Sequence, residues 1–413
     1  MLSRCLRAPN GPLTGVRVLD LSRILAGPYA TMMLGDMGAD IVKVERPIVG
    51  DDTRRWGPPF TETGHESAYF ISVNRNKRSI AIDLKREAGQ ELVTKLIERS
   101  DIVIDNFAPG DARKLGLDRE EIRTSNDRLI WCSITGYGPD GPLANRLGYA
   151  VLVEAHAGLM NATGPRGGDP VKAGVALTDV LTGLHASTSI LAALHHRSMT
   201  GKGTSIDCSL LESQVSGMVN IASNYLIAGQ DSQRLGTGHA SIVPYGCVRT
   251  RDGMMALAAG NDKQFEGLCE CLGLRHLSSD DRFKSNSARV KNRDHLIASL
   301  ESVTTRKSAS EWIDIFNRIE GSDKFAFAPV NNMKQVFQDP QVLHRNMVLE
   351  VDHLTAGRIK LPGVPFKFPD FPANEGHTAP PVLGQHSREV LESVLGYSEN
   401  EIQKLINDKV VFP

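Results

Sequence analysis

The fold class is decided by two apolar stretches, Gly15-Val16-Arg17-Val18-Leu19-Asp20-Leu21 and Ile41-Val42-Lys43-Val44-Glu45. Each is short and rich in Val, Ile and Leu, as buried strands are. Between them, residues 28–37 carry apolar side chains at helical spacing. The alternation continues, with strands predicted at 79–84, 101–105, 129–135 and 205–209 and helices at 87–98, 119–124, 180–197 and 210–226. Strands that alternate with helices form βαβ units, so the sequence predicts an α/β fold with a parallel sheet.

A second, smaller domain is predicted from residue 229 onward. The chain has 413 residues, more than the ~250–300 that one hydrophobic core usually serves. An Asp252-Gly253 turn between two apolar stretches predicts a β-hairpin, and helical patterns follow it. The predicted domains are an α+β domain over 229–327, a large α/β domain over 15–228 and 328–413, and an N-terminal extension over 1–14.

Composition excludes several classes of partner. The chain has 47 Lys and Arg against 48 Asp and Glu, a net charge of −1. Nucleic-acid-binding proteins carry a basic excess, so no nucleic-acid partner is expected. No uninterrupted apolar run reaches the ~18 residues of a membrane span, so no membrane partner is expected either. The 6 cysteines are scattered and lack a CxxC motif, which predicts neither a disulfide framework nor a metal site.

The first residues are basic and free of acids. Arg4, Arg7 and Arg17 precede the first acidic residue, Asp20. This bias is typical of a mitochondrial presequence. The alternative is an unstructured start in front of the first strand, in a cytoplasmic protein.

A glycine motif, Gly136-Tyr137-Gly138-Pro139-Asp140-Gly141, follows a predicted strand. A dinucleotide site needs a helix directly after the glycines, because the phosphates bind free helical N–H groups. Pro139 and Pro142 follow instead, so no nicotinamide or flavin cofactor is expected. The carboxyl end of a strand still suits another ligand.

A basic stretch, Asn74-Arg75-Asn76-Lys77-Arg78, precedes another predicted strand. Two interpretations stay open. Lys and Arg are mostly exposed, which favours a solvated loop. The same side chains are suited to binding a polyphosphate, since Arg donates in pairs and Lys supplies charge.

Asp179 stands in front of the apolar run that begins at Val180. Asp is a favoured N-cap residue, so helix capping is the plain interpretation. The same position suits a reactive carboxylate, because the helix dipole favours its ionised form.

In this order, the segments resemble the class III CoA-transferases, the family of formyl-CoA and carnitine CoA-transferases. The resemblance covers nearly the whole chain, from Gly15 to Val410. It is carried by Met33-Leu34-Gly35-Asp36-Met37-Gly38-Ala39-Asp40-Ile41-Val42-Lys43-Val44-Glu45, Asn76-Lys77-Arg78-Ser79, Asn106-Phe107 with Pro109-Gly110, Gly136-Tyr137-Gly138 and Pro380-Pro381-Val382-Leu383-Gly384-Gln385-His386. The stretch from Leu235 to Tyr245 is most similar to the succinyl-CoA:glutarate branch of the family.

The resemblance implies a Rossmann-like large domain and an interlocked homodimer. It also implies acyl-CoA thioesters and dicarboxylates as substrates, with no permanently bound cofactor and no metal. The succinyl-CoA:glutarate branch is mitochondrial in animals and moves CoA from succinyl-CoA to glutarate and related dicarboxylates.

The family's nucleophile corresponds to Asp179, in Gly174-Val175-Ala176-Leu177-Thr178-Asp179. The resemblance implies that Asp179 attacks the thioester, forms a mixed anhydride and then an aspartyl-CoA thioester, and passes CoA to the acceptor. Residues that match the family's lid are Gly260 and Asn261; capping of the next helix is the alternative role for Asn261. Positions that match the family's CoA contacts are Ile24, Ala26, Arg46, Lys77, Asn106, Phe107, Lys114 and Tyr137.

Several parts of the chain depart from the family pattern, among them Lys114, which stands where a relative has Arg. Leu25 replaces the Gln of formyl-transferring members, which argues against formyl or oxalyl substrates. Ala150 replaces a common Asp, and residues 322–329 replace a Gly- and Pro-containing turn. Two other functions therefore stay open: a 2-methylacyl-CoA racemase of the same fold, which needs a proton-transferring pair such as His and Asp, and a catalytically silent CoA-binding protein.

Overall fold

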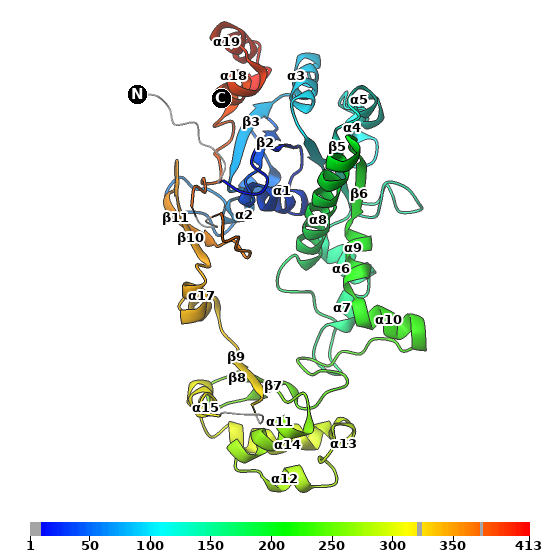
Figure 1. The fold of residues 1–413 in the computed structure, drawn as a ribbon, viewed down its shortest axis with the longest axis vertical. Helices are drawn as coiled ribbons and strands as arrows, with labels where there is room; N and C mark the ends of the chain where they lie inside the picture. Colours follow the sequence, from blue (N-terminus) through cyan, green and yellow to red (C-terminus); the bar gives the residue numbers. More distant parts are fainter. Residues whose placement is uncertain (1–9, 320–323, 372–374) are drawn as a thin grey trace. The chain divides into compact units, whose positions relative to one another are not determined.

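The computed structural model of the chain describes residues 10–319, 324–371 and 375–413 (Figure 1). Most of the predicted N-terminal extension, including Arg4 and Arg7, lies outside the described residues, as does the start of the departing turn at 322–323. The chain divides into two compact units. Unit 1 runs to Leu159 and continues with Ala173–Gln230 and Pro340–Pro413, and unit 2 comprises Met160–Lys172 and Asp231–Asp339. Segments 160–172 and 328–339, which the sequence placed in the large domain, thus belong to unit 2.

Unit 1 is built on a seven-stranded sheet with the strand order β12-β3-β2-β1-β4-β5-β6. Six strands are parallel, which confirms the predicted α/β class. The last strand was not predicted: β12, at the end of the chain, pairs antiparallel with β3. The strands are β1 (Arg17–Asp20), β2 (Asp40–Glu45), β3 (Lys77–Ile82), β4 (Ile102–Asp105), β5 (Ile130–Thr135), β6 (Ser205–Ser209) and β12 (Val411–Phe412).

Helices cover both faces of this sheet (Figure 1). Successive side chains of a strand point to opposite faces, so Leu19 and Val18 of β1 belong to different apolar layers. Leu19 packs in the layer of α3 (Glu87–Glu98), α18 (Ser387–Leu395) and α19 (Glu399–Asn407). Val18 packs in the layer of α1 (Ala26–Asp36), α6 (Ala150–His156), α8 (Leu177–Thr200) and α9 (Leu210–Gly217). Both faces are therefore buried, as a parallel sheet requires.

Helix α8 is long and apolar enough to cross a membrane by length and composition alone. Buried helices of globular cores pass the same test, so this is weak evidence for a membrane span. In unit 1, Ala186, Ile190 and Ala193 of α8 pack in the same apolar layer as α1.

The predicted helix 210–226 is two helices, α9 and α10 (Val219–Ala228), which meet at Met218. Val219 has a φ of +40°, outside the helical region, and this breaks the continuous run. Helix α10 leaves Leu226 and Ile227 81% and 85% exposed. Unit 1 also contains the short elements η1 (Asp52–Arg55), α2 (Ala68–Ser72), α4 (Asp111–Lys114), α5 (Arg119–Ser125) and α17 (Pro340–His344) and the antiparallel hairpin of β10 (Val348–His353) and β11 (Gly357–Pro362).

Unit 2 contains a three-stranded antiparallel sheet with the order β7-β8-β9. The hairpin of β7 (Tyr245–Arg249) and β8 (Met254–Ala258) confirms the prediction from the Asp252-Gly253 turn. The third strand, β9 (Ala326–Pro329), was not predicted. Helices α11 and α14 pack against this sheet through Phe265, Leu268 and Leu296. The helices are α7 (Leu159–Ala162), α11 (Asp262–Cys271), α12 (His276–Ser279), α13 (Asn286–Lys291), α14 (Arg293–Thr304), α15 (Ala309–Phe316) and α16 (Met333–Val336).

Candidate active site

Two adjoining cavities of unit 1 are lined by loops that leave the parallel strands at their carboxyl ends, where open α/β sheets bind ligands. We call them the large cavity, about 650 Å³, and the Asp179 cavity, about 380 Å³. Arg23, Phe107 and Asp111 line both, so the two cavities adjoin at these side chains.

Asp179 lies in the first turn of α8, three residues after the N-cap position. The N-cap residue is Ala176, which makes no side-chain capping bond, so the capping interpretation of Asp179 was wrong. Its neighbour Thr178 is fully buried and donates a hydrogen bond from Oγ1 to Gln214 Oε1 (2.6 Å). This bond ties the first turn of α8 to α9 and fixes the direction in which Asp179 leaves the helix.

The Asp179 carboxyl group has an unusual environment. Burial and, secondarily, the negative charge of Glu154 raise its pKa to about 6. Glu154 lies on α6, is 2% exposed, and accepts a hydrogen bond from the Ala173 N–H (3.1 Å). Within the described residues, no donor bonds the Asp179 carboxylate. The group is thus mostly ionised at neutral pH, weakly solvated and unpaired, as a carboxylate nucleophile must be.

The wall opposite α8 is the loop between β1 and α1. Here Ile24 has a φ of +73°, a left-handed conformation that is rare and unfavourable for a β-branched residue. Its N–H donates to both carboxylate oxygens of Asp51 (3.2 Å each). The Asn106 side chain makes two hydrogen bonds to Arg23, the residue before Ile24. Its Oδ1 accepts from the Arg23 N–H (2.9 Å), and its Nδ2 donates to the Arg23 carbonyl oxygen (2.7 Å). The loop is therefore held from two sides.

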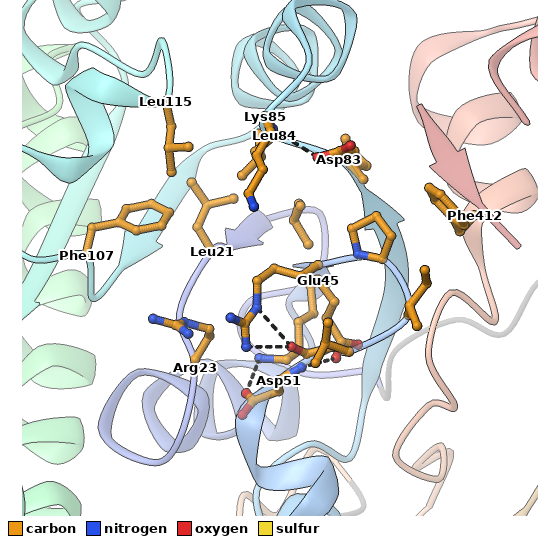
Figure 2. A pocket seen from close by; sticks show the side chains of 18 of the residues that line it. Leu21, Arg23, Glu45, Asp51, Asp83, Leu84, Lys85, Phe107, Leu115 and Phe412 are labelled. Atoms are coloured by element: carbon orange, nitrogen blue, oxygen red, sulfur yellow. Dashed lines mark hydrogen bonds and ion pairs between the residues drawn. The ribbon is translucent and has the colours of Figure 1, made fainter. Parts of the chain in front are cut away.

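Beneath the large cavity lies a group of buried charges (Figure 2). Lys43 Nζ is fully buried, 3.1 Å from Asp51 Oδ2, and donates to the Ser22 carbonyl oxygen. Glu45 accepts two hydrogen bonds from the Arg54 guanidinium, one from Nε and one from Nη2 (2.7 Å each). The lysine keeps the pKa of Asp51 below its usual value despite burial. These acids are neutralised from within the protein. On the rim, Arg23 and Arg46 both pair with Asp52 and Lys114 pairs with Asp111, and all of these side chains are partly exposed, so a ligand competes with acids for the rim cations.

The rim of the large cavity carries cationic and apolar side chains. Figure 2 shows Phe107 and Leu115 on one side, Phe412 on the other, and Leu84 and Lys85 between them. Arg23, Arg46 and Lys114 complete the cationic lining. Such a surface suits a ligand with both anionic and aromatic parts.

The structure brings most of the predicted site residues together. Ile24, Ala26, Asn106 and Phe107 line the Asp179 cavity with Asp179 itself. Arg46, Phe107 and Lys114 line the large cavity. Because Phe107 belongs to both sets, these seven residues line two adjoining cavities.

Lys77 and Tyr137 line neither cavity. Lys77 is 1% exposed, and its Nζ donates to Asp20 Oδ2, Pro28 O and Asn74 Oδ1 at 3.1, 2.8 and 2.9 Å. Burial lowers the pKa of Lys77 to about 8. Tyr137 is also buried, its ring 5.5 Å from that of His156. Both side chains therefore support the walls rather than face the space.

Both interpretations of the basic stretch 74–78 were wrong. It is neither a solvated loop nor a free phosphate clamp, because its first four residues are at most 4% exposed. Arg75 makes a two-bond ion pair with Asp36 (2.7 and 2.6 Å), and Arg78 bonds Asp40. The charges of Arg75 and Arg78 are paired with acids of α1 and β2, which lie far away in the sequence.

The glycine motif after β5 lets two backbone segments pack closely against each other. A Cβ on Gly136 would lie 2.7 Å from the Gly148 Cα, so neither position accepts a side chain. Gly136 and Gly148 both line the Asp179 cavity. The close approach of the two backbones thus shapes this cavity, and no helix of the dinucleotide type follows.

The predicted lid residues lie in unit 2. Asn261 is the N-cap of α11 and accepts from Gln264 N (2.9 Å), as the capping alternative predicted. Gly260 N–H donates to Gln264 Oε1 (2.7 Å). This turn is a local cap, and the lid role stays a prediction.

Sequence reasoning missed several residues that form the site. Arg23 and Asp51 follow predicted strands, and the shared carboxyl edge of a parallel sheet is a signal that identifies such loops. Glu154 and Phe412 carried no such signal, since α6 and β12 reach the site only through tertiary packing. The described residues include no group of three or more His, Cys, Asp or Glu side chains placed to hold a metal ion.

Comparisons with known proteins identify the family. The sequence model of CoA-transferase family III matches residues 13–387. Succinyl-CoA:glutarate CoA-transferase of Mus musculus is 46% identical over 400 residues, which cover 97% of this chain and 90% of the relative. Succinate–glutarate CoA-transferase of Agrobacterium fabrum is 42% identical over 92% of this chain and 95% of the relative.

A solved structure agrees with these sequences. The crystal structure of a CAIB/BAIF family protein from Brucella suis has a TM-score of 0.83 and 39% identity, and the match covers 93% of this chain and all of that chain. The chain therefore belongs to CoA-transferase family III, whose members are enzymes that transfer coenzyme A.

Proposed function

We propose that this enzyme moves CoA from succinyl-CoA to glutarate or a related dicarboxylate, with Asp179 as a covalent nucleophile. The observation that carries the proposal is the partly buried, unpaired Asp179 carboxylate in a cavity that adjoins a larger one. The names of the mouse and Agrobacterium relatives supply the substrates.

The large cavity suits the nucleotide end of CoA. Its Arg23, Arg46, Lys85 and Lys114 supply cations for phosphates, and its apolar rim supplies a surface for adenine. From there the shared side chain of Phe107 leads to the Asp179 cavity, where the thioester has to lie. The narrow cavity then takes the acyl group.

The proposed reaction is a sequence of balanced acyl transfers. An Asp179 oxygen attacks the succinyl carbonyl carbon, the C–S bond breaks, and CoA leaves as the thiolate. The thiolate attacks the aspartyl carbonyl of the mixed anhydride, which releases succinate and forms an aspartyl-CoA thioester. A carboxylate oxygen of the acceptor displaces CoA again, and the thiolate then attacks the acceptor acyl carbon. Asp179 returns to its free carboxylate, so no further reactant is needed.

This chemistry requires that water be kept from the activated Asp179, because hydrolysis would waste the thioester. The partly buried position of Asp179 supports such exclusion. We include Gly260 and Asn261 in the proposal as the lid, on the strength of the family resemblance alone.

The test is a matrix of donors and acceptors followed by mass spectrometry. We expect succinyl-CoA with glutarate to give glutaryl-CoA, and hydroxylamine to convert the donor-treated enzyme to a hydroxamate at Asp179. Asp179→Asn, which keeps the shape, should give neither product. Transfer by Asp179→Asn at the normal rate would contradict the nucleophile, and absence of transfer from every dicarboxylate pair would contradict the function.

The racemase alternative has less support. It needs a second proton-transferring group next to the thioester, and among the described residues no histidine lines the Asp179 cavity. Deuterium uptake at the α-carbon of a 2-methylacyl-CoA without CoA exchange would favour it. Binding of CoA without either reaction would favour a catalytically silent protein.

We further propose that the enzyme is a homodimer, interlocked as the family resemblance implies, and that it acts in mitochondria. The exposed side chains of Val219, Tyr225, Leu226 and Ile227 on α10 support association, since apolar groups exposed side by side are unusual on a monomer. Light scattering during size exclusion tests the dimer: a mass of 45.0 kDa would contradict it.

Imaging of the chain fused to a fluorescent protein tests the mitochondrial location.

A further inference from the structure

The loop between β1 and α1 is fixed residue by residue. Ser22 N–H bonds Asp20 Oδ1 (2.9 Å) at the end of β1, and Arg23 is bonded through both backbone groups by Asn106 at the end of β4. Ile24 N–H bonds Asp51 after β2. Three neighbouring strands thus each supply one side chain that holds one residue of this loop.

Asp51 is itself buried and held by several partners. It is 1% exposed, pairs with the buried Lys43, and accepts from the N–H (3.0 Å) and Oγ1 (2.7 Å) of Thr53. An acceptor with this many partners cannot follow the loop if the loop moves. The bonds from the Ile24 N–H to Asp51 and those of Asn106 fix the peptide between Arg23 and Ile24, and on the other side the Leu25 carbonyl oxygen accepts from the Tyr29 N–H (2.7 Å) at the start of α1, so the left-handed φ of Ile24 is set between two anchored segments.

The strain lies at Ile24, directly after the doubly bonded Arg23. A β-branched residue at a φ of +73° persists only where the surroundings over-determine it. Release of the loop would let Ile24 return to a negative φ and would displace Leu25 and Ala26 at the start of α1. Those residues form the wall of the Asp179 cavity, and Arg23 lines both cavities.

We propose that Asn106 and Asp51 are positioning residues that hold the 23–25 loop in a strained conformation, and that this conformation shapes the shared wall of the two cavities. The strained φ of Ile24 is then part of what shapes this wall. The activity readout of this idea rests on the proposed CoA transfer.

The decisive experiment is a double-mutant cycle between Asn106→Ala and Ile24→Gly. Asn106 is preferred to Asp51, because removing the Asp51 charge breaks the buried ion pair with Lys43 and endangers folding. We expect Asn106→Ala to lower kcat/KM for succinyl-CoA about 30-fold, since displacement of a site wall by about 1 Å has effects of this order. In the Ile24→Gly background, where the left-handed φ is free of strain, the same change should cost only about threefold.

Asn286 provides a matched control. It bridges another loop in the same way, accepting from Val243 N (3.2 Å) and donating to the Ser241 carbonyl oxygen (2.8 Å), in unit 2. Asn286→Ala should leave kcat/KM per folded molecule within about twofold of the original value, and Ile24→Gly should not alter its effect. An equal loss in the Asn106→Ala variant with and without Ile24→Gly would overturn the strain idea.

Amide hydrogen exchange tests the loop without reference to activity. The amide of Ile24 should exchange slowly in the unliganded enzyme, because its acceptor is buried. Asn106→Ala should speed this exchange at least about tenfold, and Ile24→Gly should restore protection. If no donor and acceptor pair shows transfer, the proposed function fails while the exchange data still decide on the loop. Rapid exchange of the Ile24 amide in the unmodified enzyme would overturn the proposal outright.

Discussion

Asp51 and Asp179 are carboxylates of unit 1, the first buried and the second partly buried, yet their environments are opposite. Asp51 faces Lys43 and three backbone or hydroxyl donors, and its pKa lies below the usual value. Asp179 faces Glu154 and no donor among the described residues, and its pKa is raised to about 6. Burial opposes ionisation at both, so the difference comes from the partners.

The comparison separates a structural role from a reactive one. A paired carboxylate has its lone pairs occupied and stabilises the fold. An unpaired one destabilises the fold at neutral pH but keeps an oxygen available for attack. The same substitution, Asp to Asn, should therefore act in opposite directions at the two sites.

The largest expected effect is on catalysis at Asp179. Asp179→Asn should lower kcat for CoA transfer by at least about 10⁴-fold, as loss of a covalent nucleophile does. At the same time its free energy of unfolding at pH 8 should rise by about 1 kcal/mol, because the buried charge is gone. Assays of transfer and urea unfolding on the same preparation measure both. A less stable Asp179→Asn protein would contradict the view that the unpaired Asp179 carboxylate destabilises the fold.

The next effect is on stability at Asp51. Asp51→Asn should lower the free energy of unfolding by about 3 kcal/mol, because the ion pair of the buried Lys43 is broken and only the more distant charges of Asp20 and Glu45 remain to offset it. The control is the double variant Lys43→Met, Asp51→Leu, which removes both charges and should recover much of the loss. Urea unfolding at pH 7.5 measures each value. Equal stability of Asp51→Asn and the unmodified protein would show that the pair is not a structural element.

How far the sequence predicts this contrast depends on where the partners lie. The parallel strands follow from their own Val, Ile and Leu residues, because a strand buried on both faces has to be apolar. Asp179 was recognised only through the family motif, since its position alone suggested a helix cap. Lys77 was predicted to contact CoA. Its side chain instead donates to Asp20, which is 57 positions away, and no local sequence pattern indicates that pairing. Glu154 and the edge strand with Phe412 were missed for the same reason.

A third prediction concerns the pH at which Asp179 becomes active. Transfer should fall as the pH drops through about 6, because the protonated carboxyl group is no nucleophile. Stability should change in the opposite sense: the folded enzyme holds this proton more tightly than the unfolded chain, so Asp179 lowers stability as the pH rises from about 4 to 6. The pH dependence of kcat/KM and of urea unfolding checks both directions.

Glu154 offers a way to sharpen that measurement. Glu154→Gln removes the charge but keeps an oxygen for the Ala173 N–H. The acid limb of the profile should move down by about half a unit, less than a full unit because burial is the larger cause. An unchanged midpoint would mean that burial alone raises the pKa of Asp179.

The smallest effect is expected at a third carboxylate, Asp111, which is paired like Asp51 but exposed. It lines both cavities and lies 2.8 Å from Lys114 Nζ, with both side chains well solvated. Solvent screens such a pair, so Asp111→Asn should leave the midpoint of thermal unfolding within about 1 °C. It also frees the Lys114 charge for a phosphate, so KM for succinyl-CoA should fall by about twofold at low salt and return to normal in 0.5 M salt. A stability loss comparable to that of Asp51→Asn would show that pairing, rather than pairing with burial, decides the structural role of these acids.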